Sequence, residues 1–192
     1  SSGVGAINFK ENNSLAGNIG LSNIAVGQIN ISANKTLSND VYNINANQIL
    51  LNLGAVLKIG SGAINGQISG VGSVELEGAN ISGLTIGANN HNISAVTVNA
   101  AKSINLSKST IYSNQVRVLE NSALNLGSAT NIYGDFVLNE NASLNINNGA
   151  NFVGAVKSSS NSNANGILNI NASQHVVDYA IGDSENSLNQ FN

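Results

Sequence analysis

The chain contains no cysteine, proline, methionine or tryptophan, and only 9% of its 192 residues are charged. Without cysteine it has no disulfide framework, no thiolate metal ligand and no thiol nucleophile. The same absence suits a protein that is exported unfolded through a narrow pore, because disulfides would close loops too early. The net charge is −3, and the seven Lys and Arg residues are scattered without forming a basic stripe. Nucleic-acid binding is therefore not expected.

Long apolar runs are also missing. No stretch of 18 apolar residues occurs, so we expect no direct membrane span in this fragment. The first residues lack the charged and apolar regions of a signal peptide and include no initiator Met, which indicates a fragment of a longer protein. The hydrophobic content of 42%, regularly spaced between Asn, Ser and Gly, argues against a disordered chain.

Aliphatic and aromatic residues recur every 20 positions. The first register consists of Ile24, Ile44, Ile64, Leu84, Ile104, Leu124 and Leu144. A second register consists of Val56, Leu76, Val96, Val116, Phe136 and Val156, and a shorter third one of Tyr112, Ile132 and Phe152. A fixed period of this length is the signature of a solenoid in which each repeat makes one turn.

Within each period, short strands alternate with turn residues. Two apolar residues flank one polar residue at 104–106, 124–126 and 144–146. Two inward apolar positions again flank a middle residue at 96–98, 116–118 and 136–138. This alternation predicts strands with one buried face, and a less regular apolar pair at 132–133 and 152–153 provides a third side. No segment has the apolar recurrence of a helix. We therefore predict an all-β chain, a three-sided parallel β-helix with about 20 residues per rung that spans 1–192.

Asparagine occupies the outward middle position of many rungs, where stacked side-chain amides can bond to one another along the axis. The predicted ladder consists of Asn45, Asn65, Asn105, Asn125 and Asn145, with Thr85 interposed. We interpret it as a structural element and not as a ligand site.

One step departs from the period. The triplet at 144–146 is followed by the next matching triplet at 168–170, a step of 24, and the excess falls at 157–165. We expect a protruding loop there, which is a candidate for contacting a partner. Its candidate partner-binding residues are Lys157, Ser158, Ser159, Ser160, Asn161, Ser162 and Asn163. Beyond it, 182–192 is expected to be an irregular tail.

Candidate catalytic and metal-binding residues are few. The ten acidic residues are dispersed, and Glu75 and Glu77 form a close pair within a predicted strand. At a spacing of 20 no acid lies one rung away from them, where Ala55, Leu57, Ala95 and Thr97 stand, so they are interpreted as outward residues on a solvated face. His91 and His175 have no neighbouring ligands at metal spacing and are interpreted as surface residues. We therefore assign no catalytic, cofactor-binding or metal-binding residue and expect no cofactor.

The rungs rich in Asn, Ser and Gly, most clearly 120–127 with its Leu124-Asn125-Leu126 triplet, resemble the passenger domain of bacterial autotransporters. In style they are similar to the vacuolating-toxin-like passengers of the Helicobacter and Campylobacter group. The resemblance covers nearly the whole chain. It implies a right-handed β-helix that is exported by type V secretion and is extracellular or attached to the bacterial outer membrane.

Three functions are considered from these observations. The leading hypothesis is a non-catalytic passenger segment that mediates adhesion, host-cell interaction or self-association, with a host-cell receptor, a glycan or sister passenger molecules as partners. An alternative is the cell-binding stem of a vacuolating or pore-forming autotransporter toxin. A second alternative is a polysaccharide-active β-helix enzyme, which would need the Glu75 and Glu77 pair for its chemistry.

Overall fold

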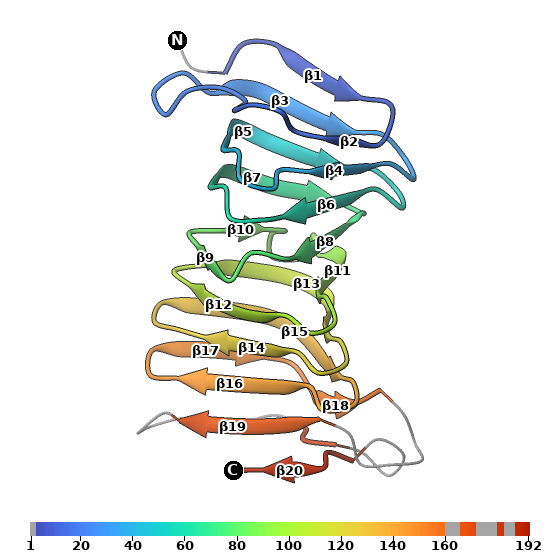
Figure 1. Ribbon diagram of the computed structural model, residues 1–192, viewed down its shortest axis with the longest axis vertical. Coiled ribbons are helices and arrows are strands. Elements are labelled where there is room, and N and C mark those ends of the chain that lie inside the picture. Colours follow the sequence, from blue (N-terminus) through green and yellow to red (C-terminus); the bar gives the residue numbers. More distant parts are fainter. Residues whose placement is uncertain (1–2, 160–165, 172–179, 183–186) are drawn as a thin grey trace.

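Parallel strands follow one another around the axis of a β-solenoid of about eight turns in the computed structural model (Figure 1). The structure describes residues 3–159, 166–171, 180–182 and 187–192, and these contain strands, turns and bends but no helix. The predicted all-β class and parallel β-helix are thereby confirmed.

The strands lie on three sides of the solenoid. The first side contains β1 (Ala6–Phe9), β3 (Val26–Ile31), β5 (Ile44–Leu51), β7 (Ile64–Gly70), β10 (Thr85–Ile86), the first parts of β13 (Thr110–Val118) and β15 (Thr130–Leu138), and β17 (Ala150–Val153). The second side contains β2 (Asn13–Ser14), β4 (Thr36–Ser38), β6 (Val56–Ile59), β8 (Ser73–Leu76), β11 (Ile93–Val98), the second parts of β13 and β15, and β18 (Val156–Ser158). These two sides form one 14-stranded sheet, because β13 and β15 run from one side to the other.

The third side is a separate six-stranded sheet. It contains β9 (Asn80–Ser82), β12 (Ser103–Ser107), β14 (Ala123–Leu126), β16 (Ser143–Asn147), β19 (Ile167–Asn171) and β20 (Gln190–Phe191). Neighbouring strands on every side come from successive turns, so each rung hydrogen-bonds only to the rungs above and below it.

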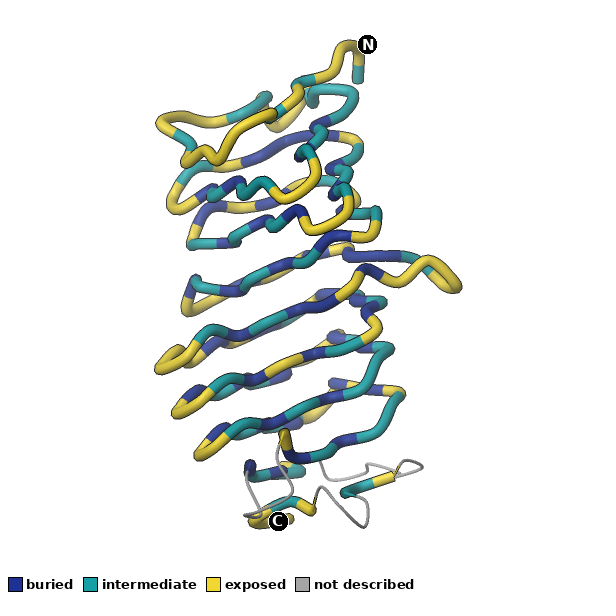
Figure 2. The backbone as a smooth tube through the Cα atoms, turned by 90° about the vertical axis from the view of Figure 1, so that its right-hand side faces the viewer, coloured by how far each residue is buried: buried dark blue, intermediate teal, exposed yellow. Residues whose placement is uncertain are grey.

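The core is a narrow column of aliphatic side chains between the three sides. Buried and half-buried residues alternate along β14 and β16, as the period-2 pattern requires, and Figure 2 shows the same alternation along most turns. Phe136 and Phe152 are fully buried and meet edge to face, with ring centroids 5.4 Å apart. Identical or similar apolar residues therefore lie on one another from rung to rung, which buries apolar area in each turn.

Asparagine and glycine at the corners allow the backbone to turn. Asn34, Asn121 and Asn141 each have a positive φ of 54° to 58°, a conformation that Asn tolerates better than other non-Gly residues. Gly134 (φ 154°) lies opposite a bulge in β13, where Cβ of any other residue would come within 2.1 Å of the Ser113 carbonyl oxygen. Asn-rich and Gly-rich connections are thus a requirement of tight corners.

The first 20-residue register is confirmed in two separate stretches. Ile44 pairs with Ile64 in the 14-stranded sheet, and Ile104 begins a ladder in the six-stranded sheet that continues through Leu124, Leu144 and Leu168. The predicted register is wrong at Ile24, one rung before Ile44, and at Leu84, one rung after Ile64. Ile24 is 61% exposed in a hairpin with Leu21, while Ile19 bridges to Ile44 in its place, and Leu84 is buried but belongs to neither ladder.

The second register is confirmed from Val96 through Val116 and Phe136 to Val156. It is wrong before that point, because Leu57, and not Val56, leads to Val74 and then to Val96. The step from Leu57 to Val74 is shorter than the period, and the step from Val74 to Val96 is longer than it. Because a short turn is followed by a long one, the average length of the two turns stays near 20 residues. The 20-residue pattern in the sequence therefore continues through two turns that do not have this length.

The third register is wrong at its first member. Ile111, and not Tyr112, pairs with Ile132 and through it with Phe152. The bulge in β13, between Tyr112 and Gln115, shifts the register, so the step from Ile111 to Ile132 exceeds the period by a single position. Tyr112 therefore points outward.

The predicted asparagine ladder is confirmed from Asn105 to Asn145, but it is wrong as a single run from Asn45, because the asparagines form two separate sets. On the third side each amide nitrogen donates to the amide oxygen of the preceding rung, over distances of 2.6 to 2.9 Å. Its members are Asn80, Asn105, Asn125, Asn145, Asn169 and Asn192. Asn65 donates to Asn45 over 2.8 Å in a separate pair, and Thr85 takes no part in either ladder.

The long step after the triplet at 144–146 is confirmed, since Leu144 pairs with Leu168. The predicted irregular tail contains a strand at its end, because Gln190 and Phe191 of β20 pair with Ile167 and Leu168 of β19. The triplet pattern contained no signal for β20, which is only two residues long.

Candidate functional site

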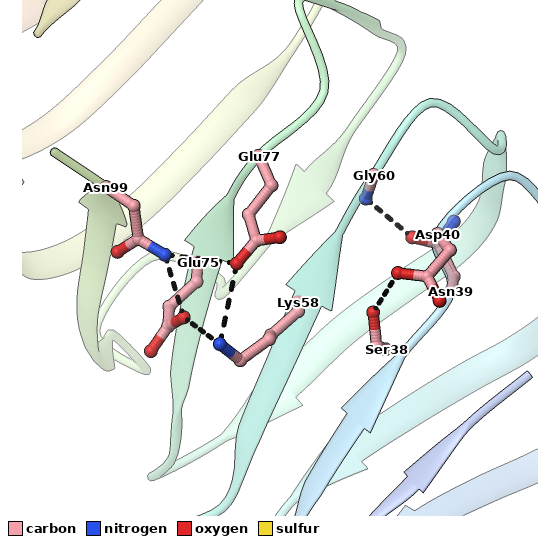
Figure 3. Close-up of polar contacts among 8 residues, drawn as sticks. All are labelled: Ser38, Asn39, Asp40, Lys58, Gly60, Glu75, Glu77 and Asn99. Atoms are coloured by element: carbon pink, nitrogen blue, oxygen red, sulfur yellow. Dashed lines mark hydrogen bonds and ion pairs between the residues drawn. The ribbon is translucent and has the colours of Figure 1, made fainter. Parts of the chain in front are cut away.

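The two acidic side chains singled out in the sequence belong to a polar cluster on the second side (Figure 3). Lys58 Nζ lies 2.9 Å from Glu75 Oε2 and 3.4 Å from Glu77 Oε1. Asn99 donates from Nδ2 to the same two carboxylates over 3.0 and 3.1 Å. The expected neighbours were wrong, because the turn before β8 is shorter than the period and therefore places Lys58 beside Glu75 where Ala55 was expected.

These contacts favour the charged forms of Glu75 and Lys58. Partial burial acts to raise the pKa of Glu75, but the hydrogen bonds from Asn99 and Lys58, with the charge of Lys58, outweigh it and leave this pKa below its ordinary value. The hydrogen bond to Glu75 raises the pKa of Lys58. A general acid needs a raised carboxyl pKa, so Glu75 has the opposite electrostatics and fits a structural role between rungs.

The first residues of the loop predicted at 157–165 belong to a strand. Lys157 and Ser158 lie in β18, where Lys157 pairs with Val137 and Ser158 with Leu138, and Ser158 is buried. Ser159 is exposed at the end of this strand. The remaining candidate residues Ser160, Asn161, Ser162 and Asn163 lie outside the described residues, so a role in partner binding stays a prediction for them.

A protrusion that the sequence pattern did not reveal lies halfway along the molecule, where Figure 2 shows an exposed loop standing out from the stack. It follows β10, where Ile86 pairs with Ile111 in a step longer than the period. Ile86 pairs with Ile111, and Ala95 pairs with Gln115, so the corner between these two positions can be compared in successive rungs. Gln115 follows Ile111 by four positions, whereas Ala95 follows Ile86 by nine positions. The additional residues lie in the 87–92 loop.

The 87–92 loop has a defined backbone. Ala88 and His91 exchange both backbone hydrogen bonds, over 3.1 and 2.8 Å, around a two-residue turn in which Asn90 has a φ of 63°. His91 Nδ1 lies 3.3 Å from the Asn89 carbonyl oxygen. At the base of the loop Gly87 N donates to the Ile68 carbonyl oxygen over 2.8 Å. The loop therefore stands out from the first side as a short hairpin.

A groove of about 660 Å³ lies between this loop and the preceding rung. Its volume falls within the range of small-molecule sites in proteins. The residues that line it carry amide, hydroxyl, imidazole or apolar groups, and none of them is Asp, Glu, Lys or Arg. They are Gln67, Ser69, Gly70, Val71, Gly87, Ala88, Asn90, His91, Asn92 and Asn114.

The polar side chains that line the groove differ in whether they form hydrogen bonds with the protein. Gln67 Nε2 donates to the Gly87 carbonyl oxygen over 3.4 Å, and Ser69 Oγ accepts from Gln48 over 3.0 Å. The side-chain amides of Asn90, Asn92 and Asn114, in contrast, make no hydrogen bond with any part of the chain that the structure describes. Three amides without a partner among the described residues therefore border the groove, while the asparagines of the ladder are bonded to one another.

Two stacked tyrosines begin one rung beyond the groove. On the outward positions of the first side, Gly87 precedes Tyr112, which pairs with Tyr133 and then Val153. The rings of Tyr112 and Tyr133 are parallel within 6°, with centroids 4.4 Å apart. Cβ of any residue other than glycine at Gly87 would lie 3.0 Å from Tyr112 Cβ, so Gly87 adjoins Tyr112 directly.

Sequence reasoning treated His91 as an isolated surface residue, and it is exposed at the edge of this groove. His175 lies outside the described residues. The polar run 89–92 is a signal that could have indicated the loop. The short turn before it compensates for the added residues, however, so the 20-residue spacing did not change. Aromatic stacking also had no signal, because the bulge moved Tyr112 out of the predicted apolar register.

Among the described residues, no three His, Asp or Glu side chains gather closely enough to hold a metal ion. The same residues include no helix of the length and apolar character needed to cross a membrane. Comparisons of the chain with protein-family models, with curated proteins and with solved structures gave no match.

Proposed function

We propose that the chain is a non-catalytic segment of an exported, surface-displayed β-solenoid passenger that mediates adhesion to host cells. The 87–92 loop carries this proposal. It lengthens one rung, contributes none of its residues 89–92 to the core, and forms one wall of a groove. A loop that costs ordering entropy without burying apolar surface is typical of a binding element on a rigid scaffold.

The acid pair supports the non-catalytic part of the proposal. Glu75 and Glu77 both contact Lys58 and Asn99, and their neighbouring positions on one strand give them no separation across a substrate. Hydrolysis of a glycosidic bond requires one carboxyl with a raised pKa and a second carboxylate across the scissile bond. The contacts of Glu75 lower its pKa.

Binding of the fluorescently labelled protein to cultured epithelial cells tests the proposal. Deletion of residues 88–92 restores the regular step from Ile86 and is expected to abolish saturable binding while leaving the strand signal in circular dichroism unchanged. A second variant lacking 160–163 shortens the long step from Leu144 to Leu168 to the regular one and tests the loop predicted from the sequence. Saturable cell binding that both deletions leave intact would contradict adhesion through either the 87–92 loop or residues 160–163.

A further inference from the structure

We propose that Asn148 is a site of spontaneous deamidation in the folded protein, and that the fold protects Asn65 from the same reaction. Each of these asparagines precedes a glycine. A third Asn-Gly dipeptide occurs at 165–166, where Asn165 lies outside the described residues. Asparagine is among the thermally labile residues of proteins. The modification is independent of the proposed adhesion, because it needs no partner other than water.

Deamidation is fastest where a glycine follows the asparagine. The backbone nitrogen of the following residue loses its proton to solvent and attacks the side-chain carbon Cγ, which closes a five-membered succinimide ring. The bond from Cγ to Nδ2 breaks, and the amide nitrogen leaves as ammonia with a proton from water. A second step adds water to either ring carbonyl and gives aspartate or isoaspartate, so the whole reaction consumes one water and releases one ammonium ion. Glycine favours the attack because it has no Cβ to hinder its nitrogen and its backbone rotates easily.

Asn148 and Gly149 form the whole corner between β16 and β17, and both are exposed (Figure 1). Gly149 has a φ of 79°, and its nitrogen donates no hydrogen bond to any residue that the structure describes. A Cβ at Gly149 would lie 3.4 Å from its nearest neighbour, Ser128 Cα, which is an ordinary van der Waals contact. The attacking nitrogen is therefore accessible, and the corner has room for the succinimide ring.

Asn65 has a different setting, although its side chain is also exposed. Its Nδ2 donates to Asn45 Oδ1 over 2.8 Å, and β7, which contains it, pairs with strands of both neighbouring rungs. A Cβ at Gly66 would lie 2.0 Å from the Ala46 carbonyl oxygen, so the backbone of the preceding rung fits closely against Gly66. Ring closure requires the Asn65 side chain to leave Asn45 and the strand to open. Such opening is rare within a paired strand.

The product differs from the original corner in charge and in length. Either isomer adds one negative charge to a chain whose formal net charge is −3, so ion exchange separates modified from unmodified molecules. Isoaspartate also adds one carbon atom to the backbone of a two-residue corner. Ala129 N donates to the Gly149 carbonyl oxygen over 2.8 Å, so the longer corner moves an acceptor that the preceding rung uses.

Timed incubation of the folded full chain in mildly alkaline buffer, followed by tryptic mapping with mass spectrometry, tests the proposal. Cleavage after lysine and arginine places the three Asn-Gly dipeptides on separate peptides, which are 59–102, 118–157 and 158–192. In the folded chain Asn65 should react at least about tenfold more slowly than Asn148, because it reacts only after local opening. In guanidinium chloride the two rates should agree within about twofold, because the protection is lost.

Two controls locate the reaction. Asn148→Gln should remove it from peptide 118–157 and leave the strand signal in circular dichroism unchanged, because the longer side chain would have to close a less favourable six-membered ring. Asn147 lies in the same peptide and precedes Asn148, whose Cβ hinders the attacking nitrogen, so Asn147 should stay unmodified. Equal rates at Asn65 and Asn148 in the folded chain, or no reaction at Asn148, would overturn the proposal. Deamidation of peptide 118–157 that persists in the Asn148→Gln variant would also overturn it.

Discussion

At the scale of single residues, asparagine has two roles that its spacing alone did not separate. Asn125 donates to Asn105 and accepts from Asn145, so both sides of its amide are used within the ladder. Asn92 and Asn114 have no such neighbours and border the groove. The difference lies in which residue occupies the same position one rung away, and this depends on the exact length of each turn.

The ladder predicts a graded loss of stability. Asn125→Ala removes both ladder hydrogen bonds, together with a long contact of 3.5 Å to Ser103 Oγ, and should lower the free energy of unfolding by about 1–2 kcal/mol. Asn80 stands at the first rung of the ladder and accepts only from Asn105, so Asn80→Ala should cost about half as much. Urea unfolding of the two variants measures this difference, and equal losses would show that the ladder bonds do not contribute separately.

The Lys58 cluster predicts a pH-dependent contribution. Because the pKa of Glu75 is lowered in the folded state, its contribution is present above the ordinary Glu pKa of about 4.3 and is lost as the pH falls through the folded value. The raised pKa of Lys58 gives a contribution that is present below its ordinary value and is lost only as the pH rises through the folded one. Between these limits the cluster should stabilise the fold.

Lys58→Met tests this contribution. At pH 7 it should lower the free energy of unfolding by about 1 kcal/mol, a modest amount because the three side chains are 26–35% exposed. At about pH 3.5, below the ordinary Glu pKa of about 4.3, the difference from the wild type should shrink as the pH falls toward the lowered pKa of Glu75. Lys35→Met is the matched control, since its partner Glu11 is 79% exposed and its pair should contribute less. A Lys58→Met deficit that is the same at both pH values would contradict the electrostatic origin.

At the scale of strands and corners, the sequence predicted what repeats and missed what changes. The ladders from Ile104 to Leu144 and from Val96 to Val156 followed from spacing, because matched apolar residues must share one buried face. The short step before β8 and the long step after β10 could not be predicted in the same way, because no apolar residue marks a corner whose length has changed. The groove depends on such a corner together with a bulge, so its residues had no common period in the sequence.

Corner geometry itself is testable at Gly134. Gly134→Ala would place Cβ 2.1 Å from the Ser113 carbonyl oxygen at a φ of 154°, so the bulge would have to rearrange. We expect a loss of at least about 2 kcal/mol in the free energy of unfolding. Gly83→Ala is the control for backbone strain alone, because Gly83 has a φ of 77° with open space around its Cβ position, and it should cost about 1 kcal/mol. Chemical denaturation compares the two, and similar losses would contradict crowding at the bulge.

At the scale of the whole molecule, stacking and not charge holds the solenoid together. Only 9% of the chain is charged, and the ion pairs seen within the described residues involve only Lys35 and Lys58. Apolar side chains fill the column from Ile29 to Leu168, and hydrogen bonds connect every pair of neighbouring strands. Salt screens exposed charges but leaves these contributions nearly unchanged.

The thermal midpoint should therefore shift by less than about 2 °C between about 50 mM and about 500 mM NaCl. Differential scanning calorimetry at the two salt concentrations measures this shift. A thermal midpoint that moved by several times this amount would contradict the account, because it would show that exposed charges contribute substantially to the stability of the stack.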